Sequence, residues 1–174
     1  MEKIASFQID HEVLVPGLYL SRMDGDISTY DLRCVKPNTP PYLENAVMHT
    51  VEHLFATYVR NSRFGEHVVY FGPMGCRTGF YFLTRGMTHE ESIALTQEAL
   101  HFIAQYTGEI PGATPEECGN YREHDLAGAR PLAARMAELL KGWKKADLAY
   151  PVESEDISDA PRECGRLRRG FRYR

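Results

Sequence analysis

Two histidines and a glutamate at helical spacing are the residues that first point to chemistry. They lie in the segment His49-Thr-Val-Glu52-His53. In a helix, residues four apart share a face, and the residue three along lies beside them. One divalent metal can bridge such an imidazole pair, which leaves the carboxylate free to move protons. The alternatives are an ordinary solvated or packed helix face and an inverted metalloprotease, because HxxEH is also that enzyme's motif.

The flanking residues predict a helix over about residues 40–62. Thr39 is an expected N-cap, and Pro40 an expected first helical residue. Apolar residues recur at helical spacing and form a single stripe: Leu43, Val47, Val51, Leu54 and Tyr58. The histidine pair and the glutamate fall on the opposite side of the wheel. We therefore expect the stripe to face the core and the chemistry to face away from it.

Two cysteines stand in settings that suit chemistry. Cys118 lies beside a glycine in the long loop 107–124, and as a thiolate it could complete a three-ligand metal site. Cys76 lies in the glycine-rich turn 72–79, where Arg77 would favour a reactive thiolate. The alternatives are an inert loop thiol and a cysteine that only ends a strand. We expect the histidines outside the pair, apart from His11, to be surface or packing residues: His67, His89, His101 and His124.

The remaining pattern predicts short strands and two more helices. We expect strands at 4–10, 17–23, 27–35, 67–71 and 80–84, and helices at 88–106 and 126–142. Thr88 and Glu91 match a capping box, Asp125 is an expected cap, and Pro131 is expected to kink or restart the last helix. Strands and helices do not alternate strictly. This order favours an α+β fold with a mostly antiparallel sheet and helices packed on one face.

Length and composition fit one domain. The chain has 174 residues, of which 43% are hydrophobic and 25% charged. We expect a single catalytic metal-binding domain over 1–150 and a loosely ordered C-terminal tail over 151–174, which carries six arginines and no apolar period.

The same bulk features limit location and partners. No apolar run approaches the roughly 20 residues of a membrane span, and the N-terminus lacks the apolar core of a signal peptide. The body before the tail is acidic, which does not suggest nucleic-acid binding. We expect a cytoplasmic protein with its four cysteines as thiols or ligands, and neither nucleic acid nor membrane as a partner.

Three motifs, in this order and spacing, resemble the S-ribosylhomocysteine lyases, the LuxS family. They are HTVEHL on the expected helix, PMGCRTGFY in the turn and ECGNYREHDLAGA in the long loop. The SFQIDH start and the DLRCVKPN segment are similar to the family as well. The resemblance covers about residues 4–143, and it implies a LuxS/metallopeptidase-like fold.

The resemblance also implies roles for single residues. The implied ligands of one divalent metal per subunit, iron(II) with zinc or cobalt as substitutes, are His49, His53 and Cys118. The implied general acid–base groups are Glu52 and Cys76. The implied substrate-pocket residues are Ser6, His11 and Arg33. A homodimer is implied too, with two sites at the subunit interface that each use both chains.

The implied reaction cleaves the thioether of S-ribosylhomocysteine. The products are homocysteine and 4,5-dihydroxy-2,3-pentanedione, the precursor of autoinducer-2. The sugar carbonyl must migrate along the chain until the sulfur lies β to it, and every step takes a proton from a carbon next to the carbonyl. A Lewis-acid metal and two separate proton-transfer groups suit that chemistry.

Two residues depart from the family pattern. Most members carry an aspartate six residues before the turn cysteine and a serine four before it, where this chain has Tyr70 and Gly72. Either Tyr70 and Arg77 replace the missing carboxylate, or the thiol is tuned differently. Two other functions stay open at this point. A metalloprotease would need a third ligand, usually a carboxylate, and a metal-stapled structural domain usually has four protein ligands.

Overall fold

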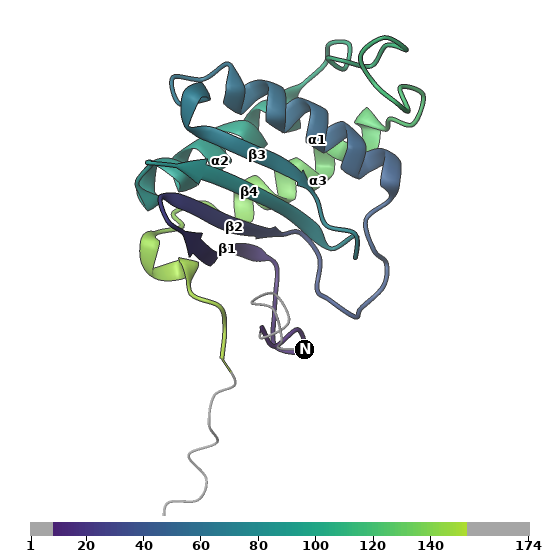
Figure 1. Cartoon of the computed structure of the whole chain (residues 1–174). Coiled ribbons are helices and arrows are strands. Elements are labelled where there is room, and N and C mark those ends of the chain that lie inside the picture. Colours follow the sequence, from purple (N-terminus) through teal and green to yellow (C-terminus); the bar gives the residue numbers. More distant parts are fainter. Residues whose placement is uncertain (1–8, 153–174) are drawn as a thin grey trace, which may run out of the picture.

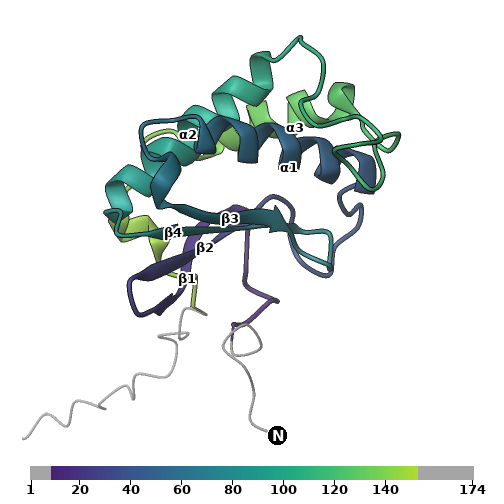
Figure 2. The same cartoon turned by 45° about the horizontal axis from the view of Figure 1, so that its top comes forward.

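Four antiparallel strands form one sheet, and three helices cover one of its faces (Figures 1 and 2). The computed structural model describes residues 9–152. The strands, in the spatial order β1-β2-β4-β3, are β1 (Gly17–Asp24), β2 (Ile27–Arg33), β3 (Val68–Pro73) and β4 (Gly79–Arg85). The helices are α1 (Asn45–Arg60), α2 (His89–Gln105) and α3 (Leu126–Leu139), with the short 3-10 turns η2 (Gly65–His67) and η3 (Lys145–Leu148). The predicted α+β fold is confirmed.

Strand β2 divides its side chains between the two faces of the sheet. Tyr30 and Leu32 belong to the hydrophobic core beneath the helices. Asp31 and Arg33 alternate with them and therefore point to the opposite face. Both charged side chains are nevertheless buried. The segment after η3 contributes to that burial, since Tyr150 bonds to Asp31.

Helix α1 begins at Asn45, five residues later than predicted. The hydroxyl of Thr39 donates to the carbonyl of Pro37 and caps no helix. Two consecutive prolines follow, and a residue that precedes a proline is kept out of the helical region. The start at Pro40 is therefore wrong, but the core stripe is confirmed, because four of its residues are buried and Tyr58 packs against the core.

The caps of the other two helices are confirmed. Thr88 and Glu91 form a capping box at α2, and the carboxylate of Asp125 accepts from the backbone N–H of Gly128 in α3. Pro131 lies inside α3 without ending or restarting it. Proline cannot donate the usual helical bond to the carbonyl of Ala127, and both residues are exposed, so water can bind that carbonyl.

Two predicted segments lie largely outside the described residues. The expected strand 4–10 falls outside as far as residue 8, and residues 9 and 10 belong to no strand. The expected tail falls outside from residue 153 onward. Between residues 9 and 152, every helix is too short or too polar to cross a membrane.

Gly79 is the first residue of β4, and it lies directly against the backbone of β2. A substitution at this position therefore tests how much stability depends on the close approach of the two strands. A Cβ there would overlap the carbonyl oxygen of Leu32 and lie 3.1 Å from the Cα of Arg33. We expect Gly79→Ala to lower the free energy of unfolding in urea by about 2–3 kcal/mol. The control is Gly75→Ala in the same turn, where a Cβ meets nothing within 4 Å. Equal stability of the two variants would contradict this account.

Candidate functional site

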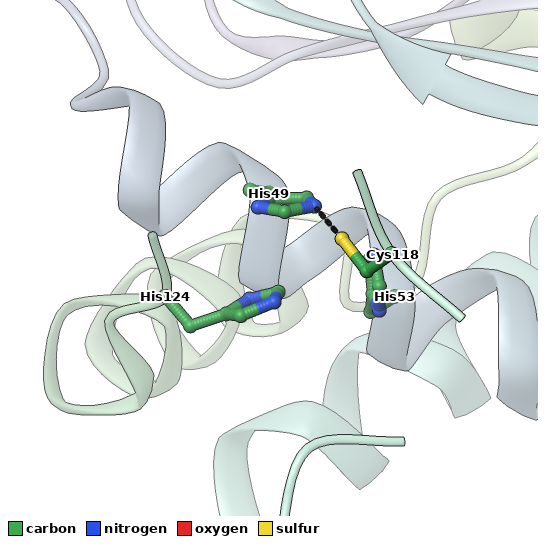
Figure 3. A group of neighbouring side chains, drawn as sticks. All are labelled: His49, His53, Cys118 and His124. Carbon is green, nitrogen blue, oxygen red and sulfur yellow. Dashed lines mark hydrogen bonds between the residues drawn. The ribbon is translucent and has the colours of Figure 1, made fainter. Parts of the chain in front are cut away.

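A cluster of four potential metal ligands lies where the loop 106–125 crosses α1 (Figure 3). His49 and His53 come from the helix, and Cys118 and His124 from the loop. Their ligand atoms all lie within 4.8 Å of one another. The Sγ atom of Cys118 is 3.3 Å from Nε2 of His49. The fold therefore brings together the three residues predicted as ligands, together with a fourth.

Backbone carbonyls of the loop fix the two helix imidazoles. Nδ1 of His49 lies 2.9 Å from the carbonyl oxygen of Glu123, and Nδ1 of His53 lies 2.8 Å from that of Pro111. A carbonyl oxygen can only accept, so each Nδ1 must carry the proton. Each Nε2 is left with a lone pair, and hydrogen bonds of this kind orient metal-binding imidazoles.

We expect His124 to be a surface or packing residue, and its ring does pack against α1, but it also belongs to the cluster of potential metal ligands. Its Nδ1 lies 3.3 Å from the hydroxyl oxygen of Thr50, whose own proton goes to the carbonyl of Ala46. Nδ1 is therefore the donor, and Nε2 carries a lone pair. Within the described residues, this buried Nε2 has no hydrogen-bond partner. Burial, and then the nearby His49 and His53, lower the pKa of His124 and so favour the neutral ring.

Packing explains why His124 belongs to the cluster. Its ring stacks on His49 with 4.1 Å between centroids and 19° between planes. The next residue, Asp125, donates its backbone N–H to the hydroxyl of Thr50, 2.8 Å away. This contact holds the end of the loop to α1. The signal in the sequence was the position of His124 directly before the N-cap of a helix, although the partner on α1 could not be read from it.

The donor set suits a borderline divalent metal ion. Imidazole nitrogens and a thiolate are ligands for zinc, iron(II) and cobalt(II). No carboxylate belongs to the cluster in the part of the chain that the structure describes. Glu52 instead lines two grooves beside it, of about 600 and 490 Å³, and His49 lines both as well. The carboxylate is thus placed to exchange protons with a molecule in the groove.

Cys76 has different partners. Its Sγ lies 3.0 Å from the hydroxyl of Thr78 and 3.9 Å from Nη1 of Arg33. The guanidinium of Arg77 is instead stacked 5.9 Å from the ring centre of Tyr42. Arg33, rather than Arg77, is therefore the cation in contact with the thiol. The thiol and the Arg33 guanidinium lie on the sheet face opposite the helices, whereas the metal-ligand cluster lies where the loop crosses α1.

Besides Arg33, the residues predicted to line the substrate pocket are His11 and Ser6. His11 is described, and its Nδ1 bonds the carbonyl of Ile9 at 2.9 Å. Burial raises the pKa of Asp31, and Arg33, Tyr150 and His11 oppose this effect, which places His11 near the Arg33 group. Ser6 lies outside the described residues.

Tyr70 and Gly72, the two residues that depart from the family pattern, lie against each other. The phenol of Tyr70 lies over Gly72 so closely that a Cβ at position 72 would overlap it. A tyrosine in this conformation therefore requires a glycine two residues on. The carboxylate nearest the thiol's cation is Asp31 on β2, which pairs with Arg33. The predicted replacement of a carboxylate by Tyr70 and Arg77 is thus not needed to explain the thiol's surroundings.

Comparison with known proteins agrees with these motifs. Residues 4–147 match the profile of the family described as S-Ribosylhomocysteinase (LuxS). A protein named S-ribosylhomocysteine lyase from Clostridium acetobutylicum is 45% identical over 157 residues, covering 87% of this chain and 99% of that protein. Proteins of the same name from Desulfotalea psychrophila and Borreliella burgdorferi are 44% and 43% identical, and cover 87% of this chain and 99% and 100% of their own lengths.

The cluster geometry predicts how the donors contribute to metal binding. We expect the protein to bind one cobalt(II) per chain with a thiolate-to-metal charge-transfer band, and Cys118→Ser to lose that band. We expect His124→Phe, which keeps the stacked ring, to weaken binding about 10–100-fold in competition with a chelator. His101→Phe, an exposed site on α2, is the matched control. Unchanged affinity in His124→Phe would exclude a role for this ring in metal binding.

Proposed function

The chain belongs to the S-ribosylhomocysteinase (LuxS) family, and from this premise we propose that it is an S-ribosylhomocysteine lyase. It cleaves the thioether of S-ribosylhomocysteine to homocysteine and 4,5-dihydroxy-2,3-pentanedione, the autoinducer-2 precursor. The observation that carries this function is the match to lyases over nearly their whole length.

The two competing functions have less support. The metalloprotease would usually need a carboxylate ligand, and within residues 9–152 the cluster contains only imidazoles and a thiol. A closed structural site would need four donors, and His124 makes that number available. Donor count alone therefore does not decide against a structural site. The family match and the groove lined by Glu52 favour catalysis.

We assign metal binding to His49, His53 and Cys118, with iron(II) as the ion and zinc or cobalt as substitutes. When bound, such an ion supplies a Lewis acid that stabilises negative charge on a substrate oxygen. His124 supports His49 by stacking and offers a further lone pair. The three described cysteines are free thiols, which supports a cytoplasmic location.

Glu52 and Cys76 move the protons. Each carbonyl migration transfers one proton between neighbouring carbons and one between neighbouring oxygens. Glu52 takes and returns protons on the groove side, and the Cys76 thiolate does so from the other side of the substrate. In the last step a base removes the proton α to the carbonyl. The carbon–sulfur bond then breaks, and its electrons leave with the homocysteine thiolate.

These two groups reach one substrate if the site is shared between two chains. Gly75 and Arg77 line the groove of their own chain, but the thiol between them contacts Arg33 and Thr78. We propose a homodimer in which the sheet face that carries Cys76, Arg33 and His11 closes the partner's metal groove. Closure would also exclude water from the reactive intermediates.

Two substitutions test the catalytic assignment. We expect Glu52→Gln and Cys76→Ala each to lower kcat/KM for homocysteine release by about 10³-fold or more, because each removes a proton-transfer group. Metal content should stay near that of the unaltered protein. Glu117→Gln, another carboxylate in the groove, is the control for Glu52. Full activity in both variants would refute the mechanism, and peptide cleavage lost in Glu52→Gln alone would favour the protease.

Mixed dimers test the shared site. Chains carrying Glu52→Gln are mixed with chains carrying Cys76→Ala under conditions that allow exchange. In a mixed dimer both defects fall in one site, and the other site is intact. Random pairing should then restore about one quarter of full activity in a two-fold symmetric dimer. Exchange is verified with a mass label. Absence of recovery despite exchange would show that each site uses one chain.

A further inference from the structure

A chain of hydrogen bonds through the buried Asp31–Arg33 pair joins the segment after η3 to the exposed Cys76 thiol. The hydroxyl of Tyr150 donates to Oδ2 of Asp31 at 3.0 Å. Asp31 pairs with Arg33, whose Nη1 lies 3.9 Å from the thiol. The side chains of Asp31 and Arg33 are only 1% and 2% exposed. The proposed mechanism uses the thiol and its cation, but assigns nothing to Tyr150.

The carboxylate of Asp31 holds the guanidinium in one orientation. Oδ1 accepts from Nε of Arg33 at 3.1 Å, and Oδ2 accepts from Nη2 at 2.6 Å. A guanidinium is planar and rigid, so this two-point pairing fixes where its remaining nitrogen points. That nitrogen, Nη1, donates to Thr78 and faces Cys76. Any movement of Asp31 is therefore passed to the cation beside the thiol.

Tyr150 is well placed to hold Asp31. Its ring stacks on Tyr19, with 5.0 Å between centroids and 24° between planes. The hydroxyl of Tyr19 donates elsewhere, to the carbonyl of Val15 at 3.0 Å. The two phenol rings are therefore stacked, and it is the hydroxyl of Tyr150 that donates to the buried carboxylate.

We propose that Tyr150 is a positioning residue for the catalytic thiol: through Asp31 it aims the Arg33 guanidinium at Cys76. The importance of this thiol for turnover rests on the proposed function, whereas the positioning itself does not. The hydroxyl of Tyr150 donates a hydrogen bond to the carboxylate of Asp31 and partly offsets its negative charge. The positive charge of the Arg33 guanidinium can then stabilise a thiolate at Cys76 more strongly. The C-terminal segment thereby sets the reactivity of a group on the β3–β4 turn.

The charges around the thiol fix the direction of the effect. The titratable and charged groups around the thiol and its cation are Arg33, Asp31, Tyr81, Tyr150 and His11, and the guanidinium of the next residue, Arg77, lies over Tyr42 instead. Without the Tyr150 hydroxyl, the carboxylate of Asp31 opposes a thiolate more strongly. The thiolate should then form only at higher pH.

Alkylation of Cys76 by iodoacetamide, followed by peptide mass spectrometry across a pH series, tests this proposal. The variant is Tyr150→Phe in the full-length metal-loaded protein, and the control is Tyr19→Phe, which removes the other hydroxyl of the stack. We expect the alkylation midpoint to rise by about 0.5 pH unit in Tyr150→Phe, or roughly threefold slower alkylation below the midpoint. Tyr19→Phe should match the unaltered protein. Coincident profiles for all three proteins would overturn the proposal.

A double-mutant cycle with Arg33→Lys tests whether Tyr150 acts through the guanidinium. Lysine cannot form the two-point pairing, so adding Tyr150→Phe should shift the profile little further. Fully additive shifts would overturn the proposed route. Thermal unfolding of each variant checks the fold, and because Arg33→Lys keeps Tyr150, it tests the orienting role of the guanidinium even if Tyr150→Phe unfolds. Alkylation requires no turnover, so a failed lyase assay with a shifted profile would reject only the proposed function.

Discussion

Two hydrogen bonds from imidazole Nδ1 atoms to loop carbonyls hold the functional site together. They tie the loop 106–125 to α1 and leave the Nε2 atoms of His49 and His53 with lone pairs, and that of His49 lies 3.3 Å from the Sγ atom of Cys118. The loop has no regular structure of its own, so these bonds also satisfy carbonyls that a helix or sheet would otherwise pair. The same contacts therefore fix the path of the loop and the orientation of the two imidazoles.

The sheet separates two kinds of chemistry. Its covered face packs against the helices (Figure 2), and the potential metal ligands lie where the loop 106–125 crosses α1. Its other face carries a buried ion pair and the thiol that this pair contacts. A single chain thus presents a metal-ligand half and a thiol half in different directions. The homodimer that we propose would use both halves at once.

Local patterns in the sequence predicted the features that depend on local physics. The stripe from Leu43 to Tyr58, the capping box at Thr88 and the shared helix face of His49 and His53 follow from spacing and residue type, whereas the resemblance to the family implied that Cys118 joins them. The helix start at Pro40 was a local error, and the other features that the sequence did not indicate depend on long-range contacts. His124 joins the cluster because Thr50, 74 residues earlier, accepts its Nδ1 proton. Arg33 reaches the thiol from a strand 43 residues away, a contact that no spacing near Cys76 indicates.

The Asp31–Arg33 pair is difficult to explain by stability alone. Burying both charges costs several kcal/mol in solvation, and apolar residues of similar volume are often equally stable in such positions. The hydrogen bonds from Tyr150 and to Thr78 reduce that cost but do not make the pair a better core than hydrocarbon would be. A buried pair does, however, fix a cation in one orientation, which an exposed and mobile arginine cannot do. Because this cation is oriented toward the one thiol that is exposed among the described cysteines, orientation gives the pair its physical rationale.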